Sequence, residues 1–301
     1  MAFSQLFRGT GVAMITPFQG DGEIDFNHLA EHTDRLIQSG ISYLVVLGTT
    51  AETPALSGKE KAEILACVMD ACGNRIPVMA GVGGNDTRAV TENLRSAWLK
   101  GVQGILSVSP YYNKPTQEGI YQHFSTIASV SDWPVMLYNV PSRTGSNMDA
   151  NTILRLAHEF QDRIVAVKEA SGDLAQVMEI VAGKPEGFLV VSGDDSLTLP
   201  MISAGADGVI SVIGNAYPAQ MSTMVASALD ASYLKARELH YRLFPMMQAI
   251  FQEGNPSGVK ASMNIQGWIE NVLRLPLIPV TKVLHDKIAQ LDAALQQTRL
   301  T

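Results

Sequence analysis

Eight short apolar runs, most of them rich in β-branched residues, recur along the chain and constrain its fold more than any other feature. Their starts lie roughly 20 to 35 residues apart, which is the length of a strand, a crossover helix and two loops. Nearly continuous apolar strands without alternation are typical of parallel sheets buried on both faces. The runs span residues 12–15, 43–47, 77–80, 104–108, 135–138, 164–167, 188–191 and 208–212.

The segments between these runs have helical patterns, and several begin with a capping signal. Asp86 precedes one of them, and Ser57 with Glu60 three residues later forms a capping-box sequence before another. Eight strand-helix units predict the α/β class and a closed (β/α)8 TIM barrel, a fold that often exceeds the usual length of one domain. The predicted helices span residues 26–39, 58–72, 87–100, 116–130, 149–160, 173–181, 197–204 and 219–229.

The strand signal ends after residue 229, and the rest of the chain is helical in pattern. Apolar residues recur at helical spacing within 232–251, for example Leu239, Leu243 and Met246. Further helical segments follow Pro256 and Pro279. We therefore expect a catalytic barrel over 1–230 and a C-terminal α-helical appendix over 231–301. No low-complexity linker separates them, so the appendix is expected to pack on the barrel.

Composition and charge exclude several classes of function. Lys and Arg total 22 against 29 Asp and Glu, which gives a net charge of −7 and no basic run for a nucleic-acid backbone. No signal-peptide pattern and no run of membrane-spanning length is present. Cys67 and Cys72 form no Cys-x-x-Cys pair, and we expect reduced packing residues. These features predict a cytoplasmic protein that binds neither nucleic acid nor membrane.

The low content of charged residues favours self-association. Only 17% of residues are charged, whereas about 25% is typical of a soluble domain. A chain with so few charges has more surface to bury than one core accounts for. We therefore expect part of its surface to be covered by other copies of the chain.

Polar side chains follow five of the eight predicted strands. Active sites of (β/α)8 barrels lie at the carboxyl ends of the strands, so hydroxyls, phenols, one lysine and one arginine are expected to converge on one mouth. The segments that carry them are 48–52, 109–113, 138–145, 168–172 and 193–195.

Lys168 is the candidate nucleophile. It follows the apolar run 164–167 directly, which would place its amine inside the mouth of the barrel. Burial favours the neutral amine, which is suited to Schiff-base chemistry on a carbonyl. The alternative is a structural lysine that forms an ion pair with Glu169 or another acid at the rim.

Two threonines and two tyrosines are further candidates. Thr49 and Thr50 follow a glycine at a strand end, where hydroxyls and backbone N–H groups can hold a carboxylate. The alternative is an ordinary Gly-Thr turn. Tyr138 and Tyr112 can relay a proton when they are hydrogen-bonded to a third hydroxyl such as that of Thr49. Both phenols also fit a purely structural role.

Arg143 is the candidate binding residue for a substrate anion. It lies in a Pro-Ser-Arg-Thr-Gly segment after the fifth strand, where its guanidinium can bind a carboxylate with two hydrogen bonds. The alternative is a surface arginine on a turn.

Three other motifs are interpreted as structural. Residues 28–32 fit the His-x-x-Glu-His pattern of some zinc proteases, but they lie on the first predicted helix, away from the mouth. The glycine-rich segment 81–85 lacks the complete dinucleotide and P-loop signatures. The pair Asp194 and Asp195 has no neighbouring histidine or further acid for a metal, and it fits a loop that starts a helix.

Taken together, these motifs resemble the dihydrodipicolinate synthase family. The likeness is carried by Gly-Thr-Thr-Ala-Glu at 48–52, Pro-Tyr-Tyr-Asn-Lys-Pro at 110–115, and the segments 138–145, 168–170 and 193–195. It runs from about residue 8 into the tail, including Asn255-Pro256 and Leu273-Arg274-Leu275-Pro276. The family consists of pyruvate-dependent aldolases of the class I type. Its members condense pyruvate with L-aspartate 4-semialdehyde to 4-hydroxy-tetrahydrodipicolinate, towards diaminopimelate and lysine.

The resemblance implies a lyase with seven site residues and no metal or organic cofactor. It implies that Lys168 forms the Schiff base and that three hydroxyls relay protons, one of them reaching into the site of a neighbouring subunit. The proton-relay residues would be Thr49, Tyr138 and Tyr112, with Tyr112 as the one that crosses to the neighbour. Thr50 and Ile210 would hold pyruvate, and Arg143 would bind the carboxylate of the semialdehyde. The implied assembly is a homotetramer, a dimer of tight dimers.

The chain departs from lysine-inhibited members of the family at three positions. Those members carry histidines where this chain has Gly58 and Lys61, and an acid where it has Ala89, whereas Asn85 and Tyr111 match. A cation and a missing carboxylate disfavour an ammonium ligand. We therefore predict weak or absent inhibition by lysine.

Two alternative functions stay open from the sequence. One is another pyruvate-dependent aldolase, of the N-acetylneuraminate lyase or 2-keto-3-deoxygluconate aldolase type, which would use the same Lys168 and Tyr138. Arg143 argues against it, since those relatives usually carry small and apolar residues there for sugar hydroxyls. The other is a non-catalytic pyruvate-binding paralogue. Retention of the lysine, both tyrosines and both threonines argues against this second alternative.

Overall fold

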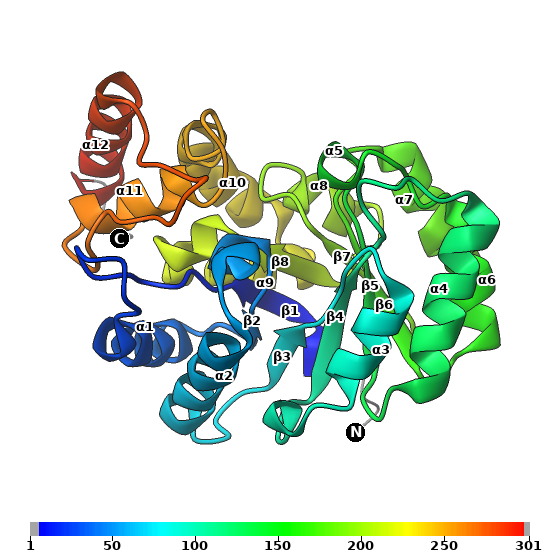
Figure 1. Cartoon of the computed structure of the whole chain (residues 1–301). Coiled ribbons are helices and arrows are strands. Elements are labelled where there is room, and N and C mark those ends of the chain that lie inside the picture. Colours follow the sequence, from blue (N-terminus) through cyan, green and yellow to red (C-terminus); the bar gives the residue numbers. More distant parts are fainter. Residues whose placement is uncertain (1–5, 298–301) are drawn as a thin grey trace.

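Eight parallel strands form a closed barrel in the computed structural model, which describes residues 6–297. Each strand pairs with the next along the chain, and β8 pairs with β1 to close the barrel. Figure 1 shows the helices arranged around these strands. The predicted (β/α)8 barrel is confirmed. The strands are β1 (Gly9–Ala13), β2 (Tyr43–Val46), β3 (Val78–Gly81), β4 (Gly104–Val108), β5 (Val135–Asn139), β6 (Ile164–Glu169), β7 (Leu189–Ser192) and β8 (Gly208–Ser211).

Helices connect the strands, and the expected capping signals act at their first turns. Ser57 and Glu60 form the predicted capping box of α2, and Asp86 accepts hydrogen bonds at the start of α3. The connecting helices are α1 (Phe26–Gln38), α2 (Gly58–Cys72), α3 (Thr87–Leu94), α4 (Gln117–Val130), α5 (Pro141–Thr144), α6 (Ala150–Glu159), α7 (Leu174–Gly183), α8 (Thr198–Ser203) and α9 (Pro218–Leu229).

Two predicted elements differ from the structure by more than two residues at one end. The first strand begins at Gly9 rather than at residue 12. The prediction missed its first residues because glycine weakens a strand pattern in the sequence. A Cβ at Gly11 would lie 2.3 Å from the ring of Tyr43, which fills the barrel interior. The helix predicted over 87–100 ends at Leu94, and a separate 3₁₀ turn follows at Ala97–Leu99.

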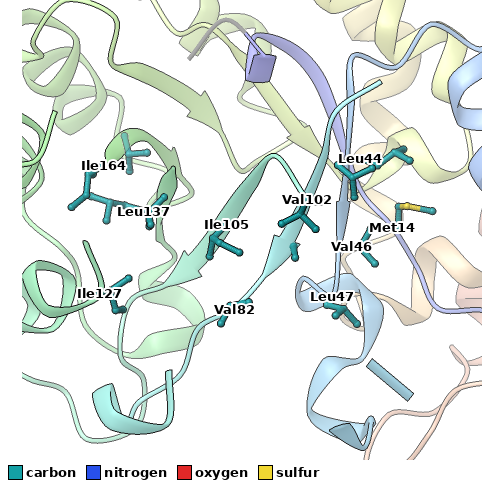
Figure 2. Packing of buried hydrophobic residues seen from close by; sticks show 14 of the residues in the cluster. Met14, Leu44, Val46, Leu47, Val82, Val102, Ile105, Ile127, Leu137 and Ile164 are labelled. Atoms are coloured by element: carbon teal, nitrogen blue, oxygen red, sulfur yellow. The ribbon is translucent and has the colours of Figure 1, made fainter. Parts of the chain in front are cut away.

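Two apolar layers lie on the two faces of the strands. On β2, Tyr43 and Val45 belong to the cluster that fills the barrel, whereas Leu44 and Val46 belong to the cluster between strands and helices. Figure 2 shows part of this outer cluster, in which strand residues such as Leu44 and Ile105 are drawn as sticks. Because side chains alternate along a strand, the inward face at the carboxyl ends is left to the site residues.

Three helices follow the barrel and form the predicted helical appendix. They are α10 (Tyr233–Ala249), α11 (Ser257–Ile265) and α12 (Lys282–Gln297), and Figure 1 shows them gathered on one side of the barrel. Their apolar residues share a core with α9 and β8, including Val209, Met221, Leu243, Val259 and Ile288. The appendix therefore packs on the barrel as expected, while the division at residue 230 stays a prediction. Within 6–297, no helix is both long and apolar enough to cross a bilayer.

The two histidines of the 28–32 motif both have structural partners. His28 forms a 2.6 Å contact with Asp25 at the start of α1. Buried His32 lies 2.9 Å from Asn215 Oδ1 through Nε2, and Arg35 donates to its Nδ1 over 3.0 Å. Because the arginine must donate, the histidine carries its proton on Nε2 and is neutral.

His32 is expected to make the fold sensitive to acid. Burial, together with the nearby Arg35, lowers the pKa of His32 from 6.5 to about 3. Below pH 6.5 the unfolded chain therefore binds a proton that the folded chain excludes, and stability falls as the pH falls. This histidine should remove about 1.4 kcal/mol of unfolding free energy per pH unit. Urea denaturation at pH 7 and pH 5 should show a weaker pH dependence for His32→Gln, and an identical dependence would contradict this assignment.

Candidate active site

Two adjoining cavities lie at the carboxyl ends of the strands. The first has a volume of about 290 Å³ and contains Lys168, and we call it the lysine cavity. The second has a volume of about 520 Å³ and extends towards the loop after Arg274, and we call it the adjoining cavity. They share five lining residues, which are Thr49, Tyr138, Val140, Arg143 and Asn255. All of these except Val140 are polar, so four polar side chains lie between the two cavities.

Lys168 lies near the end of β6, buried and aimed at the lysine cavity. Its side chain is next to that of Tyr138 on β5, because the two residues are paired in the parallel register. The distance from Lys168 Nζ to the centre of the Tyr138 ring is 4.1 Å. A Cβ at position 193 would lie 3.0 Å from Lys168 Cε, so Gly193 leaves the room that the lysine needs. Within 6–297, no acidic side chain forms an ion pair with Lys168.

Glu169 does not provide the ion pair that sequence alone left open. It points away from the cavity and accepts hydrogen bonds from Asn139 Nδ2 and Gln176 Nε2, each over 3.0 Å. The backbone N–H of Ser171 donates a third bond over 2.7 Å. The carboxylate of Glu169 is thus hydrogen-bonded by neutral N–H groups away from the cavity, and the amine of Lys168 has no ion-pair partner within 6–297.

The threonine pair lies on a short 3₁₀ turn after β2. Thr49 lines both cavities, and buried Thr50 lines the lysine cavity. The hydroxyl of Thr50 accepts a 3.0 Å hydrogen bond from Asn255 Nδ2. The hydroxyl of Thr53 donates to the carbonyl oxygen of Gly48 over 2.8 Å, which ties down the loop that follows the strand.

Arg143 lies on the short helix α5, which the sequence analysis did not predict. The helix begins at Pro141 and ends at Thr144, and the following residue, Gly145, has a left-handed φ of 75°. Proline at the first position and glycine after the last are the signals that could have found it. Arg143 is exposed, lines both cavities and forms no ion pair with any residue in 6–297. Its guanidinium is therefore available to an anion in either cavity.

The structure does not bring Tyr112 and Ile210 to the lysine cavity. Tyr112 is 88% exposed, and its backbone adopts a left-handed φ of 72°. Ile210 is buried in the apolar interior of the barrel, and Val212 two residues further on lines the cavity instead. Within one chain, the cavity thus combines Lys168 with the other predicted residues but not with these two.

Asn255 is a cavity residue that was not among the site residues predicted from the sequence. It follows α10 in the appendix, forms a cis peptide bond with Pro256 and lines both cavities. Its Nδ2 donates to Thr50, whereas its buried Oδ1 has no hydrogen-bond partner among the described residues. The Asn-Pro pair is visible in the sequence, but it comes well after the last barrel strand in the chain. Only the packing of the appendix shows that it reaches the mouth of the barrel.

The two aspartates after β7 have different surroundings. Asp194 lines the lysine cavity, and its Oδ1 accepts hydrogen bonds from the backbone N–H groups of Ser196 and Leu197. Asp195 is buried, and burial raises its pKa to about 6 even though Val212 N and Ile213 N donate to its Oδ2. Asp195 therefore ties the start of α8 to the end of β8.

A buried ion pair joins the appendix to the threonine turn. Lys260 on α11 is fully buried, and its Nζ lies 2.5 Å from Glu52 Oε1. Arg274 donates its backbone N–H to Glu52 Oε2 over 2.9 Å. Burial lowers the pKa of Lys260 to about 8. Glu52 directly follows the threonine turn, and Lys260 and Arg274 of the appendix hold its carboxylate in place.

A barrel with an unpaired, buried lysine beside a tyrosine and two threonines at its mouth is typical of aldolases that form a Schiff base with a carbonyl substrate. Comparison with known proteins narrows this class. The model of the dihydrodipicolinate synthetase family matches residues 6–298, and the chain belongs to this family.

Individual relatives agree with this membership over nearly the whole chain. The 4-hydroxy-tetrahydrodipicolinate synthase of Parabacteroides distasonis is 50% identical over 94% of this chain and 95% of its own length. That of Azobacteroides pseudotrichonymphae is 51% identical with the same coverage. The crystal structure of dihydrodipicolinate synthase from Aquifex aeolicus superposes with a TM-score of 0.93 at 39% identity, covering 96% of this chain and 98% of that one. The predicted family and enzyme class, a lyase, are confirmed.

Proposed function

We propose that the chain condenses pyruvate with L-aspartate 4-semialdehyde to 4-hydroxy-tetrahydrodipicolinate, a step towards diaminopimelate and lysine. The observation that carries this proposal is the buried amine of Lys168, which has no acidic partner within 6–297 and lies 4.1 Å from the ring centre of Tyr138. The names of the relatives support the same reaction. Two free cysteines, Cys67 and Cys72, fit the cytoplasmic location that is part of the proposal.

The proposed reaction begins when Lys168 Nζ attacks the ketone carbon of pyruvate and water leaves. The resulting iminium accepts the electrons released when a methyl proton is removed, which gives an enamine. The enamine carbon then forms a bond to the aldehyde carbon, and a proton is delivered to the new alkoxide. Tyr138 and Thr49, which line the same cavity wall, would move these protons together with Tyr112. No metal or organic cofactor enters this scheme.

The proposed binding roles differ in how far the geometry supports them. Thr50 lines the lysine cavity and would hold pyruvate near the lysine. Ile210, to which the family resemblance assigns the same role, lies in the apolar interior of the barrel and does not line this cavity. Arg143 would bind the carboxylate of the semialdehyde with two charge-assisted hydrogen bonds, since no residue within 6–297 engages it in an ion pair. A cation at this position favours a second carboxylate over the hydroxyls of a sugar-derived aldehyde.

Tyr112 supports an assembly in which copies of the chain complete one another's sites. Its side chain is almost fully exposed, and its left-handed backbone presents it outward, away from the lysine cavity of its own chain. An exposed phenol with a strained backbone fits insertion into a neighbouring subunit. We therefore infer a homotetramer, a dimer of tight dimers, as the active form.

Arg143→Ala is expected to impair the reaction of the semialdehyde but not the binding of pyruvate. The variant should still form the pyruvate adduct at Lys168, because Arg143 acts on the second substrate. The kcat/KM for the semialdehyde should fall about 10- to 100-fold, the effect of losing charge-assisted hydrogen bonds. Steady-state assays and borohydride trapping measure both effects, with Arg155→Ala as a control, since Arg155 pairs with Glu118 on the outer surface. Unchanged turnover would remove the main support for the second substrate.

Weak or absent inhibition by L-lysine is also expected. Lys61 lines the adjoining cavity together with Tyr111. Its cation would repel the ammonium groups of lysine, and Gly58 and Ala89 supply no compensating side chain. A steady-state titration with L-lysine should leave activity essentially unchanged, whereas inhibition at micromolar concentrations would contradict the prediction.

A further inference from the structure

The strand that carries Lys168 contains an extra residue. Consecutive residues of β5 pair with Ile164 and Ala166 of β6, so Val165 between them has no partner on β5. Val165 and Ala166 both belong to the apolar cluster that fills the barrel, although neighbours on a regular strand point to opposite faces. The strand therefore contains a β-bulge, and each side chain after it lies on the face opposite to the one that regular alternation would give.

The bulge decides which face of β6 carries the lysine. Ile164, labelled in Figure 2, lies in the outer cluster between strands and helices. Strict alternation from there would turn Lys168 outward into this apolar layer and Glu169 into the barrel. With the bulge, Lys168 lines the lysine cavity and Glu169 meets α7 outside the barrel. The amine that the proposed reaction needs therefore reaches the cavity only in the bulged register.

Buried polar side chains meet β6 on its outer face, just after the lysine. Glu169 accepts hydrogen bonds from Asn139 Nδ2 and Gln176 Nε2, each over 3.0 Å. Asn147 Nδ2 donates to Gln176 Oε1 over 2.7 Å, and Asn139 Oδ1 accepts from the N–H of Met148 over 3.0 Å. The first three side chains are each no more than 9% exposed. We call Asn139, Glu169, Gln176 and Asn147 the Glu169 cluster.

The Glu169 cluster joins the residues that follow the proposed catalytic pair. Tyr138 pairs with Lys168 in the register of β5 and β6, and Asn139 pairs with Glu169 one position further on. The members of the first pair face the cavity, while those of the second are hydrogen-bonded to each other on the outer face. A slip to the unbulged register would leave a buried carboxylate and buried amides without partners, which is costly. The cluster thus opposes that slip.

We propose that the Glu169 cluster holds the bulged register of β6 and so directs the amine of Lys168 into the cavity. Glu169 is a positioning residue, which acts through the lysine and touches no substrate. The inference rests on the proposed function, because it concerns the nucleophile of that reaction. It assigns a task to a buried carboxylate that forms no ion pair within 6–297 and that the reaction scheme does not use.

Glu169→Gln tests the proposal, and the exchange variant Glu169→Gln with Gln176→Glu provides the rescue. The single substitution puts an NH2 group where the amides of the cluster need an acceptor. In the exchange variant the new glutamine can donate to the new glutamate. Ser171 N and Asn147 Nδ2, which now donate to the two exchanged side chains, each keep an acceptor. The exchange variant therefore restores the cluster while it moves the charge to α7.

Asp207→Asn is the matched control for a general loss of stability. Oδ2 of Asp207 accepts hydrogen bonds from Lys184 Nζ over 2.9 Å and from Val190 N over 3.0 Å. Asp207 directly precedes β8, so these contacts lie at the amino ends of the strands, away from the lysine cavity. The substitution disturbs a strand contact of a carboxylate without touching the register of β6.

The measured quantity is the rate at which borohydride-trapped pyruvate appears on Lys168, at saturating pyruvate and per folded protein as judged by circular dichroism. We expect this rate to fall about 10- to 100-fold in Glu169→Gln, because a displacement of about 1 Å can cost that much. Most of the rate should return in the exchange variant, and Asp207→Asn should react as fast as the wild type.

An unchanged rate in folded Glu169→Gln, or an equal slowing in Asp207→Asn, would overturn the proposal. So would an exchange variant that is unfolded or as slow as the single variant, since it restores the cluster. If Glu169→Gln does not fold, the exchange variant decides by the same criterion. A wild-type protein that forms no adduct on Lys168 would refute the proposed function instead.

Discussion

Replacing Lys168 by methionine is expected to lower the rate of condensation at least about a thousandfold, because the covalent nucleophile is removed. Methionine is of similar length and is unbranched, so it should fill the space that Gly193 leaves for the lysine. No other lysine lines the lysine cavity within 6–297, and only Lys61 lines the adjoining one. Lys61→Met is therefore the matched control and should retain activity. Comparable losses in both variants would contradict the assignment of the nucleophile.

Lys168→Met, combined with Tyr112→Phe, also tests whether neighbouring subunits share an active site. Tyr112→Phe should lose proton relay, whereas Lys168→Met should lose the nucleophile. If Tyr112 enters the neighbour's site, mixed dimers contain one site with both an intact lysine and an intact tyrosine. Unfolding and refolding the two inactive proteins together should then restore part of the activity. No recovery in verified mixed oligomers, or full activity in stable monomers, would refute the shared site.

Lys260→Met is expected to lower the free energy of unfolding by about 3–5 kcal/mol, the cost of leaving a buried charge without its partner. The carboxylate of Glu52 is buried, and Lys260 Nζ is its only charged partner at 2.5 Å among the described residues. In the double variant Glu52→Gln with Lys260→Met the uncompensated charge is absent. A neutral side chain at position 52 can still accept from the N–H of Arg274, so most of the stability should return.

Urea denaturation of the wild type, of both single variants (Lys260→Met and Glu52→Gln) and of the double variant measures this coupling. The non-additivity of the two substitutions reports the interaction between the buried groups directly. A double variant as unstable as Lys260→Met would show that the lysine acts through packing, for example against Phe18, whose ring centre lies 4.3 Å from Nζ. In that case the ion pair would not hold the threonine turn.

Strand periodicity explains why the barrel could be predicted from sequence. Near-continuous apolar runs such as 104–108 and 135–138 mark buried parallel strands, and their regular spacing sets the number of units. The start of β1 was misplaced because Gly11 is required by a contact with the ring of Tyr43, which is distant in sequence and which no local pattern records. The end of α3 was misplaced because its polar sequence continues in helical pattern beyond Leu94.

Positions at strand ends were predictable, but contacts between distant segments were not. Lys168 and Tyr138 follow apolar runs directly, so a parallel register brings them together. Asn255 and Lys260 reach the threonine turn from more than 200 positions along the chain, at sequence separations of 205 and 208. Such pairings depend on how the appendix packs. Asp194 lies in the loop before α8, where its Oδ1 accepts from Ser196 N and Leu197 N, and its place in the lining of the lysine cavity is visible only in three dimensions.

Borohydride reduction in the presence of pyruvate tests the proposed chemistry most directly. The reduction converts an imine into a stable secondary amine, and peptide mass mapping locates the modified residue. We expect one reduced pyruvate on Lys168, none on Lys61, and no adduct in Lys168→Met. An unmodified Lys168 in protein that turns over both substrates, or an adduct at another lysine, would contradict the Schiff-base mechanism at this site.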